Sequence, residues 1–592
     1  MARRGFTVLF TLLGFAVFIS IVGFVALYLV FGREPAVPSN ATLVLKVGGD
    51  LSEIAPSDVV TYVRGVRTPT VRSIVDNLRK AAVDSRVTGV LLKPTGFESP
   101  FWGKVQEIRD AVLEFRQKSH KPVYAYLEYG GDREYYLATA ADKIYLMPSA
   151  TLDTVGVATY ELFLRGTLDR IGAYPDLHHI GDYKTAVNTF TEKTFTKAHR
   201  EMDESLNRDL YEQIVRGIAD GRKKDEADVR ALIDRGPFLP EDALRAGLID
   251  DVAYEDQVDD KLRAGERRQR FDGDDYARVS TQSLGLNRGP RIAVIYAAGA
   301  IAGGRSGFDP LNGAVAGSET LIDYIRQARK DSSIRAIVLR IDSPGGSASA
   351  SDAIWRELQI AKTERADRPL VASMSDLAAS GGYYIAMPAQ VIVAQPSTLT
   401  GSIGIFGGKV VTGGVYEKVG AHIESTSIGK NAEIESPARP FNASELKKLN
   451  DQLQSFYDQF VEKVAASRHS TPEQIDTLAQ GRVWTGRQAK QNHLVDELGG
   501  LDRAIAIAKQ RAKIAADSDV EIVVYPPRKS FYELLSEQFN PGGGSNDSAA
   551  VAAWLSVNLS KGELDVLRTL RGPLGLFRRG EPLALMPYTF VR

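Results

Sequence analysis

The sequence predicts an α/β protein with two tandem copies of one domain behind an N-terminal transmembrane helix. Three observations support this prediction: an uncharged apolar stretch near the start, a set of motifs that occurs twice, and short apolar runs that alternate with helical patterns. Such alternation is typical of a parallel sheet with helices packed on it.

The apolar stretch runs from Gly5 to Phe31 without a charged residue. About 20 apolar residues are enough to cross a bilayer as a helix. Arg3 and Arg4 precede the stretch, which favours a cytoplasmic N-terminus and a large domain region on the other side of the membrane. A cleaved signal peptide is the alternative. Its apolar core would be shorter and would end in small residues, whereas Arg33-Glu-Pro35 follows here.

The repeat is clearest where Tyr135-Tyr136 and Tyr383-Tyr384 begin similar segments, and the same spacing aligns Gly156 with Gly404. A polar stretch rich in Arg, Asp and Gly separates the copies and predicts a linker. The predicted organisation is an N-terminal stub and anchor at 1–36, a first domain at 44–262, a linker at 263–290, a second domain at 291–510 and a C-terminal extension at 511–592. The sequence assigns no chemistry to the extension.

The elements of the second copy follow from its apolar periodicity. Strands are predicted at 291–296, 336–341, 370–374 and 391–394, and helices at 318–330, 350–363, 380–387, 443–467 and 486–491.

Composition excludes several classes of function. Lys and Arg total 73 and Asp and Glu total 74, so a net charge of −1 gives no basic excess for binding nucleic acid. The absence of cysteine removes disulfides, cysteine nucleophiles and thiolate metal sites. Because no cluster of His, Asp and Glu with ligand spacing is evident, we expect neither a metal nor a cofactor.

Ser380 is the candidate nucleophile. It begins the predicted helix at 380–387, and its neighbours Gly381 and Gly382 leave room for a substrate backbone. A serine at a helix start is usually an N-cap. The first copy has Asp132-Arg-Glu134 at these positions, and an aspartate would cap a helix equally well, but a cap alone gives no reason for the glycines.

A serine nucleophile needs a base, and Lys184 is the candidate. The stretch Thr400–Gly408, where a Ser/His site of the Clp type would have its histidine, contains none, although a distant histidine stays possible. The second copy has Ala432 where the first has Lys184, so each copy carries half of a Ser/Lys pair. Most lysines lie on the surface, whereas a base must be neutral, which burial favours by lowering the pKa.

The segment Asp342-Ser-Pro-Gly345-Gly346 follows a predicted strand. Two glycines after proline let the backbone turn tightly and present N–H groups that can bind an oxyanion. A plain strand-to-helix turn explains the same residues.

These motifs together resemble those of signal peptide peptidase A (protease IV) in its long, two-copy bacterial form. The resemblance covers nearly the whole chain. Besides the anchor it rests on Gly181-Asp-Tyr-Lys184, Asp342-Ser-Pro-Gly-Gly346, Ser380-Gly-Gly-Tyr383, Thr400-Gly-Ser-Ile-Gly404 and Gly481-Arg-Val-Trp-Thr-Gly486.

The resemblance implies two Clp/crotonase-like domains and a serine endopeptidase whose Ser/Lys dyad degrades cleaved signal peptides. It assigns the nucleophile to Ser380 and the general base to Lys184. The N–H groups of Gly381 and Gly346 would hold the oxyanion, and Ser402 would orient the lysine. It further implies a homotetramer with a single span in the cell inner membrane and catalytic domains on the periplasmic side.

Two other functions stay open. An acyl-CoA enzyme of the crotonase class would share the fold and the glycine-based oxyanion hole, but would leave Ser380 and Lys184 idle. A non-catalytic membrane scaffold of the same fold would not need Ser380 at all.

Overall fold

The computed structural model describes residues 34–54, 69–263, 269–309, 313–527, 581–586 and 590–591, with a few isolated positions besides. Most of the predicted anchor, Gly5–Phe31, lies outside the described residues. Within the described part of the chain, no helix combines the length and the apolar character that a membrane span requires.

The first copy is built on a six-stranded sheet in which all neighbouring strands are parallel. The strands, in spatial order, are β10 (Gln269–Asp272), β1 (Ala41–Gly49), β2 (Val87–Phe97), β3 (Val123–Leu127), β5 (Lys143–Leu146) and β9 (Asp251–Val252). The helices of this copy are α3 (Val71–Val83), α4 (Gly103–Ser119), α5 (Asp132–Ala138), α6 (Arg165–Ile171), α7 (Asn188–Thr191), α8 (Lys197–Arg222), α9 (Glu226–Ile233), α10 (Pro240–Arg245), α11 (Glu255–Arg263) and α12 (Gly273–Tyr276).

The second copy is built on an eight-stranded sheet that is parallel except where β19 meets β21. Its main path is β21 (Val483–Thr485), β19 (Leu399–Gly401), β17 (Leu370–Ala379), β15 (Ile334–Ser343), β11 (Arg291–Ala298) and β23 (Glu521–Tyr525). Off this path, β18 (Val391–Ala394) pairs with β17, and β22 (Glu497–Leu498) pairs with β18. Its helices are α13 (Ser318–Lys330), α14 (Ala348–Glu364), α15 (Gly381–Ala386), α16 (Gly413–Lys418), α17 (Ala443–Arg468), α18 (Pro472–Leu478), α19 (Gly486–Gln491) and α20 (Leu501–Arg511).

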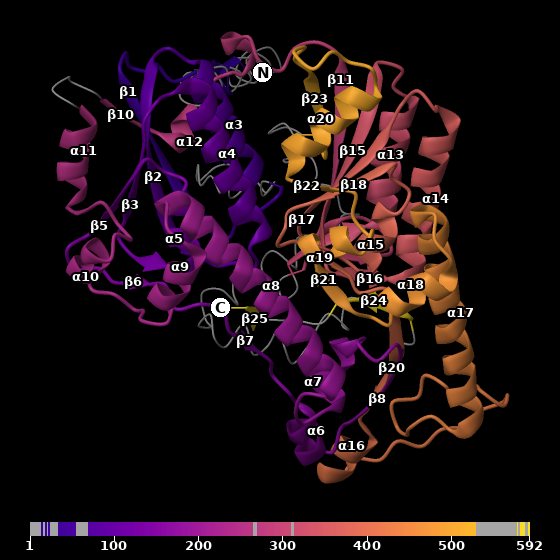
Figure 1. Ribbon diagram of the computed structural model, residues 1–592. Coiled ribbons are helices and arrows are strands. Elements are labelled where there is room, and N and C mark those ends of the chain that lie inside the picture. The colour runs from indigo at the N-terminus through magenta and orange to yellow at the C-terminus, as the bar shows by residue number, and fades with distance from the viewer. Residues whose placement is uncertain are drawn as a thin grey trace, which may run out of the picture.

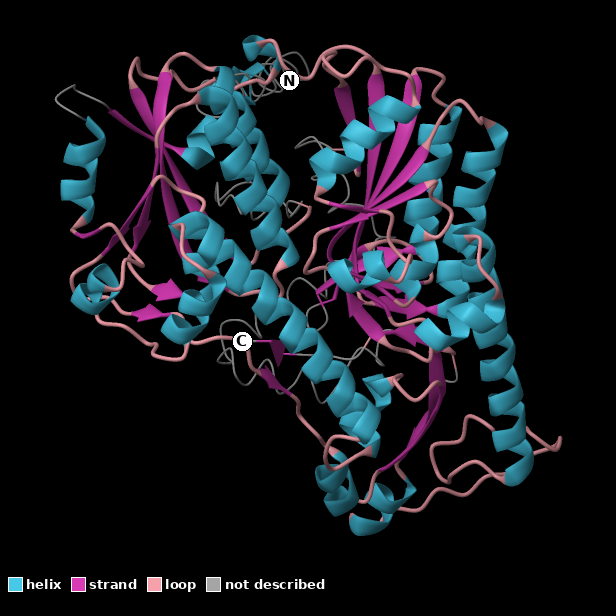
Figure 2. Ribbon diagram, viewed as in Figure 1, coloured by secondary structure: helices cyan, strands magenta, loops and turns pink. Residues whose placement is uncertain are grey.

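The duplication is visible in the lengths of corresponding helices. Helices α3 and α13 each have 13 residues, α4 and α14 each have 17, and α8 and α17 each have 26. Local sequence explains these elements: α3 begins at a capping box of Thr70 and Ser73, and Ile74 and Leu78 bury one face. Figures 1 and 2 show the two sheets side by side with helices around them, as the alternating pattern predicts.

A third sheet of seven strands joins the copies. Its order is β13 (Gly307–Asp309), β14 (Gly313–Gly317), β12 (Ala300–Ala302), β16 (Gly345–Ser347), β24 (Leu583–Leu585), β20 (Ile405–Val411) and β8 (Tyr174–Ile180). Strand β8 belongs to the first copy but pairs along its whole length, antiparallel, with β20 of the second. The chain of the first copy therefore reaches across to the second before α8 leads it back (Figure 1).

Buried ion pairs also connect the copies. The guanidinium of Arg340, on β15, donates to Glu53 at 2.7 Å and to Glu107 at 2.7 Å, and all three side chains are buried. Lys104, on α4, lies 2.7 Å from the carboxylate of Asp342 in the second copy. Since unpaired buried charges are costly, these contacts hold the two copies in one arrangement.

Two predicted boundaries differ from the structure. The predicted linker at 263–290 contains β10, which extends the first sheet, and α12, whose Tyr276 is fully buried in the first core. The C-terminal extension supplies β23 to the second sheet and β24 to the shared sheet. Strand β10 looks like a linker in sequence because it is an edge strand and exposes Gln269 and Arg270. The remaining short elements are β4 (Gly130–Gly131), β6 (Leu152–Asp153), β7 (Thr159–Tyr160), β25 (Phe590–Val591) and the 3₁₀ turns at Thr185–Val187 and Gln282–Leu284.

Candidate active site

Ser380 lies at the junction between β17 and α15, as its predicted place at a helix start requires. Its backbone has φ 55° and ψ −111°, a conformation that L-residues rarely adopt. The N–H of Ser380 donates to the carbonyl of Gly401 at 2.7 Å, and the N–H of Tyr384 donates to the carbonyl of Ser380 at 2.9 Å. A strained serine that is held by its surroundings is a frequent feature of functional sites.

Lys184 lies four residues after the end of β8 and enters the second copy because of the pairing between β8 and β20. Its side chain is fully buried. Gly481, with φ 79°, packs so closely that a Cβ there would lie 2.5 Å from the Cα and N of Lys184. A Cβ at Gly404 would lie 3.2 Å from the Cδ of Lys184. Gly404 and Gly481, which belong to the quoted sequence motifs, therefore leave the space that Lys184 occupies.

The structure brings Lys184 and Ser380 together within one chain. Nζ lies 2.7 Å from the Oγ of Ser380, 3.0 Å from the Oγ of Ser402 and 3.0 Å from the carbonyl oxygen of Ser402. A neutral amine has two N–H donors and one lone pair. If both donors point to Ser402, the lone pair faces Ser380 and can accept its proton.

The charge environment separates Lys184 from another buried lysine. Burial lowers the pKa of Lys184 well below its ordinary value, and no charged group offsets that effect. Burial acts in the same direction on Lys104, but the carboxylates of Asp342, Asp376 and Glu53 raise its pKa overall. Lys104 is thus a structural cation, whereas burial favours the neutral form of the Lys184 amine.

The glycines expected to bind an oxyanion lie next to Ser380. A Cβ at Gly381 would come within 3.1 Å of both the Cα of Gly345 and the N of Gly346, and within 2.7 Å of the Oγ of Ser351. Gly345 and Gly346 have φ values of 98° and 155° and form the start of β16. The two glycine segments therefore pack backbone to backbone beside the serine.

Corresponding positions in the first copy do other work. The side chain of Asp132, which aligns with Ser380, accepts hydrogen bonds from the N–H groups of Val155 and Gly156. Ala432, which aligns with Lys184, lies in a turn on the second copy. Among the described residues, no histidine lies within hydrogen-bonding distance of Ser380.

One feature beside Ser380 has no signal in the sequence. Strand β24 of the C-terminal extension pairs antiparallel with β16, and the N–H of Met586 donates to the carbonyl of Pro344 at 2.8 Å. Met586 packs in an apolar cluster with Ala379, Met202 and Val483. Residues 582–586 therefore cover one edge of the glycine strand next to the serine.

Comparison with known proteins identifies a family. Residues 115–268 and 362–515 each match Peptidase family S49. The chain is 37% identical to "Serine protease SPPA, chloroplastic" of Arabidopsis thaliana, over 84% of this chain and 73% of that protein. It is 36% identical to "Protease 4" of Salmonella typhi, over 74% of this chain and 72% of that protein. A shorter match, 30% identical over 35% of this chain and 59% of the relative, is "Putative signal peptide peptidase SppA" of Enterococcus faecium.

Proposed function

Because this chain belongs to peptidase family S49 and is a serine peptidase with two tandem copies of the family's domain, we propose that Ser380 and Lys184 form its catalytic dyad. The observation that supports this most directly is the 2.7 Å separation of Nζ and Oγ, with the amine fully buried and unpaired by any carboxylate. Such an amine is the base that a serine nucleophile needs.

The proposed reaction is acyl transfer. Neutral Lys184 takes the proton of the Ser380 hydroxyl while Oγ attacks the carbonyl carbon of the scissile bond. The oxygen that becomes negative is held by the N–H groups of Gly381 and Gly346. The ammonium of Lys184 then gives its proton to the leaving amine, and an ester on Ser380 remains. Lys184 next takes a proton from water, which attacks the ester carbon. The ester bond to Oγ then breaks, Lys184 gives that proton to Oγ, and the second product leaves with its new carboxyl end.

Ser402 has a positioning role in this proposal. Its hydroxyl and carbonyl oxygens, both 3.0 Å from Nζ, accept the two N–H groups of the neutral amine. The lone pair is then directed at Ser380 rather than being free to rotate away. Ser402 has a left-handed backbone, with φ 50°, and both of its oxygens contact Nζ.

Peptides are the proposed substrates, with cleaved signal peptides as the natural class. The support is the family membership and the printed name of the Enterococcus relative. The apolar stretch Gly5–Phe31 supports a single-pass anchor in the inner membrane with the two domains on the periplasmic side. A homotetramer is part of the same proposal and is tested by the mass of the purified assembly.

The decisive experiment is labelling with a serine-reactive phosphonate, followed by peptide mapping and a peptidase assay. Ser380 should be the labelled residue. Ser380→Ala and Lys184→Ala should each abolish cleavage, and the double variant should lose no more, since the two residues act as a unit. Lys447→Ala, which changes an exposed lysine, should label and cleave as the unaltered protein does.

Four results would contradict the proposal. Label on another residue would remove Ser380 as nucleophile, and substantial cleavage by Lys184→Ala would remove the dyad. Turnover of an acyl-CoA thioester without peptide cleavage would favour the crotonase class. Full biological effect of Ser380→Ala would favour a scaffold.

A further inference from the structure

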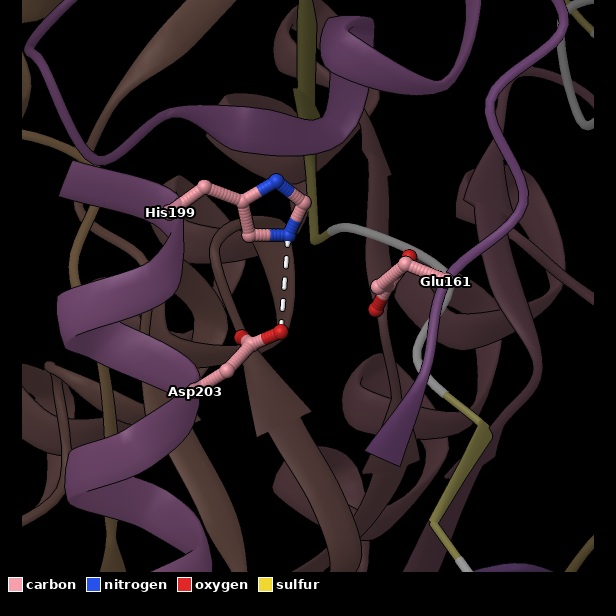
Figure 3. A group of neighbouring side chains, drawn as sticks. All are labelled: Glu161, His199 and Asp203. Carbon is pink, nitrogen blue, oxygen red and sulfur yellow. Dashed lines mark ion pairs between the residues drawn. The ribbon is translucent and has the colours of Figure 1, made fainter. Parts of the chain in front are cut away.

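A second cluster of chemically capable side chains lies away from Ser380. His199 and Asp203 occupy successive turns of α8 and point to the same side, and Glu161 follows β7 on the neighbouring segment. Each of the three offers one ligand-type atom, and these atoms all lie within 4.8 Å of one another. Figure 3 shows the Glu161 side chain reaching toward the His199 and Asp203 pair. Wide spacing in the sequence and a single histidine hide this group from motif analysis.

His199 and Asp203 combine deep burial with ligand atoms that lack hydrogen bonds. Their side chains are only 2% and 7% exposed. Nε2 of His199 and both carboxylate oxygens of Asp203 make no hydrogen bond to any described residue, and Nε2 lies 3.7 Å from Oδ2, which is too far for one. Leaving such groups buried and unpaired is costly, so their joint direction toward one point calls for a partner.

The described residues around His199 and Asp203 do not supply that partner. The rings of Phe163 and Phe195 lie 6.0 and 4.9 Å from the ring of His199, centroid to centroid. A cation placed between the three side chains would give these buried ligand atoms the partner that they lack.

We propose that Glu161, His199 and Asp203 bind one divalent first-row transition-metal ion, with Zn²⁺ as the best match. One imidazole nitrogen with two carboxylate oxygens suits Zn²⁺, whereas Ca²⁺ and Mg²⁺ prefer oxygen ligands alone. Three protein ligands leave a fourth position for water. Nε2 faces the cluster, while Nδ1 lies 3.5 Å from the side-chain nitrogen of Asn188 on the other side. Metal binding at Nε2 requires a proton on Nδ1, so the side-chain amide of Asn188 would have to turn its oxygen toward Nδ1.

The position of the cluster gives the ion a structural effect on the proposed peptidase site. Asn188 begins the helix α7, which follows the 3₁₀ turn next to Lys184. On α8 itself, Met202 packs against Ala379, the residue before Ser380. An ion that joins the start of α8 to Glu161 would therefore stiffen the framework on which both catalytic residues rest.

The test measures metal binding directly. Full-length Ser380→Ala protein without a histidine tag is stripped with EDTA, titrated with ZnCl₂, and analysed by calorimetry and elemental analysis. We expect one Zn²⁺ per chain, a higher unfolding temperature with Zn²⁺ than without, and little effect of Ca²⁺. The Ser380→Ala background makes the result independent of peptidase activity.

Asp203→Asn and Glu161→Gln should each weaken Zn²⁺ binding by at least about 10- to 100-fold, the loss that even an outer partner of a metal ligand causes. The matched control is His178→Gln. His178 lies 2.9 Å from a carboxylate oxygen of Asp176 in an ordinary hydrogen-bonded pair, so its loss should leave Zn²⁺ binding unchanged.

The unfolding temperature of the metal-free variant distinguishes the loss of a metal ligand from misfolding. Metal-free Asp203→Asn should unfold at the same or a higher temperature than the metal-free parent, because it lacks a buried unpaired carboxylate, yet Zn²⁺ should not stabilise it further. The proposal fails if the parent protein takes up no Zn²⁺ at micromolar concentration. It also fails if the two variants retain the same stoichiometry and affinity, or if only Ca²⁺ or Mg²⁺ binds.

Discussion

The buried amine of Lys184 should make the stability of the protein depend on pH, and Lys184→Met should remove that dependence. Burial lowers the pKa of Lys184 in the folded protein, whereas a lysine in the unfolded chain has a pKa of about 10.4. Between these two pKa values the unfolded chain binds more protons than the folded one, so stability rises with pH. Below the folded pKa the full penalty is present, and above about 10.4 it is gone.

The size of the effect follows from linkage. Each pH unit between the two pKa values corresponds to about 1.36 kcal/mol. Methionine removes the titration and also the three contacts that Nζ makes with Ser380 and Ser402, but those lost contacts are the same at every pH. The free energy of unfolding of the variant is therefore compared with that of the parent at pH 7 and again at pH 10.5. The change in this difference between the two pH values reports the titration of Lys184.

The assay is equilibrium urea unfolding of both full-length proteins at the two pH values, followed by tryptophan fluorescence. The free energy of unfolding of Lys184→Met, taken relative to that of the parent, should be higher at pH 7 than at pH 10.5. The difference should match about 1.36 kcal/mol per pH unit between 10.4 and the midpoint of the kinetic pH profile. Lys104→Met is the control: its pKa is raised by paired carboxylates, so its loss of stability should be nearly equal at both pH values. Equal differences for Lys184→Met at pH 7 and pH 10.5 would refute the lowered pKa.

Three further predictions concern activity. The kcat/KM of the unaltered protein should rise tenfold per pH unit up to a midpoint that lies above the pKa of a free histidine, about 6.5. Lys184→Arg should be inactive because a guanidinium stays protonated. A midpoint near 6.5 together with an active Lys184→Arg would show that the base is a histidine. Ser402→Ala should lower kcat/KM by roughly 10- to 100-fold, and Ser402→Thr should recover part of it because the hydroxyl returns; an unchanged rate for the alanine variant would deny Ser402 a positioning role. Gly481→Ala should abolish cleavage because the new Cβ would meet the backbone of Lys184. Gly420 has a similar φ of 75° but open space around it, so Gly420→Ala should cleave normally. Equal rates for the two variants would show that cleavage does not need the close packing at Gly481.

The sequence predicts the central pair of the candidate site because the duplication provides its own alignment. Ala432 stands where the first copy has Lys184, and Asp132 stands where the second copy has Ser380. That complementary pattern selects one lysine and one serine without any knowledge of distance. Helices and parallel strands were also predictable, since their apolar periodicities are strong and local, and the predicted helices at 318–330 and 486–491 match α13 and α19.

What the sequence does not reveal is pairing between distant segments. Nothing local in Tyr174–Ile180 indicates that this strand pairs with β20, and without that pairing Lys184 has no route to Ser380. Strand β24 has only three residues, too few for a periodic signal. The group of Glu161, His199 and Asp203 is similarly invisible, because folding alone brings its distant members together.

The division of the site between the copies has a consequence for biosynthesis. Ser380 lies 196 residues after Lys184, and ribosomes add roughly 5–20 residues per second, so roughly 10–40 seconds separate the two during translation. The first copy can complete its own sheet during that interval, but it then holds a lysine with no hydroxyl beside it. Strand β19, which pairs with the end of β17 just before Ser380, and β21, which pairs with β19, are synthesised later still. A ribosome-bound chain therefore cannot assemble the proposed peptidase site until most of the protein has been made.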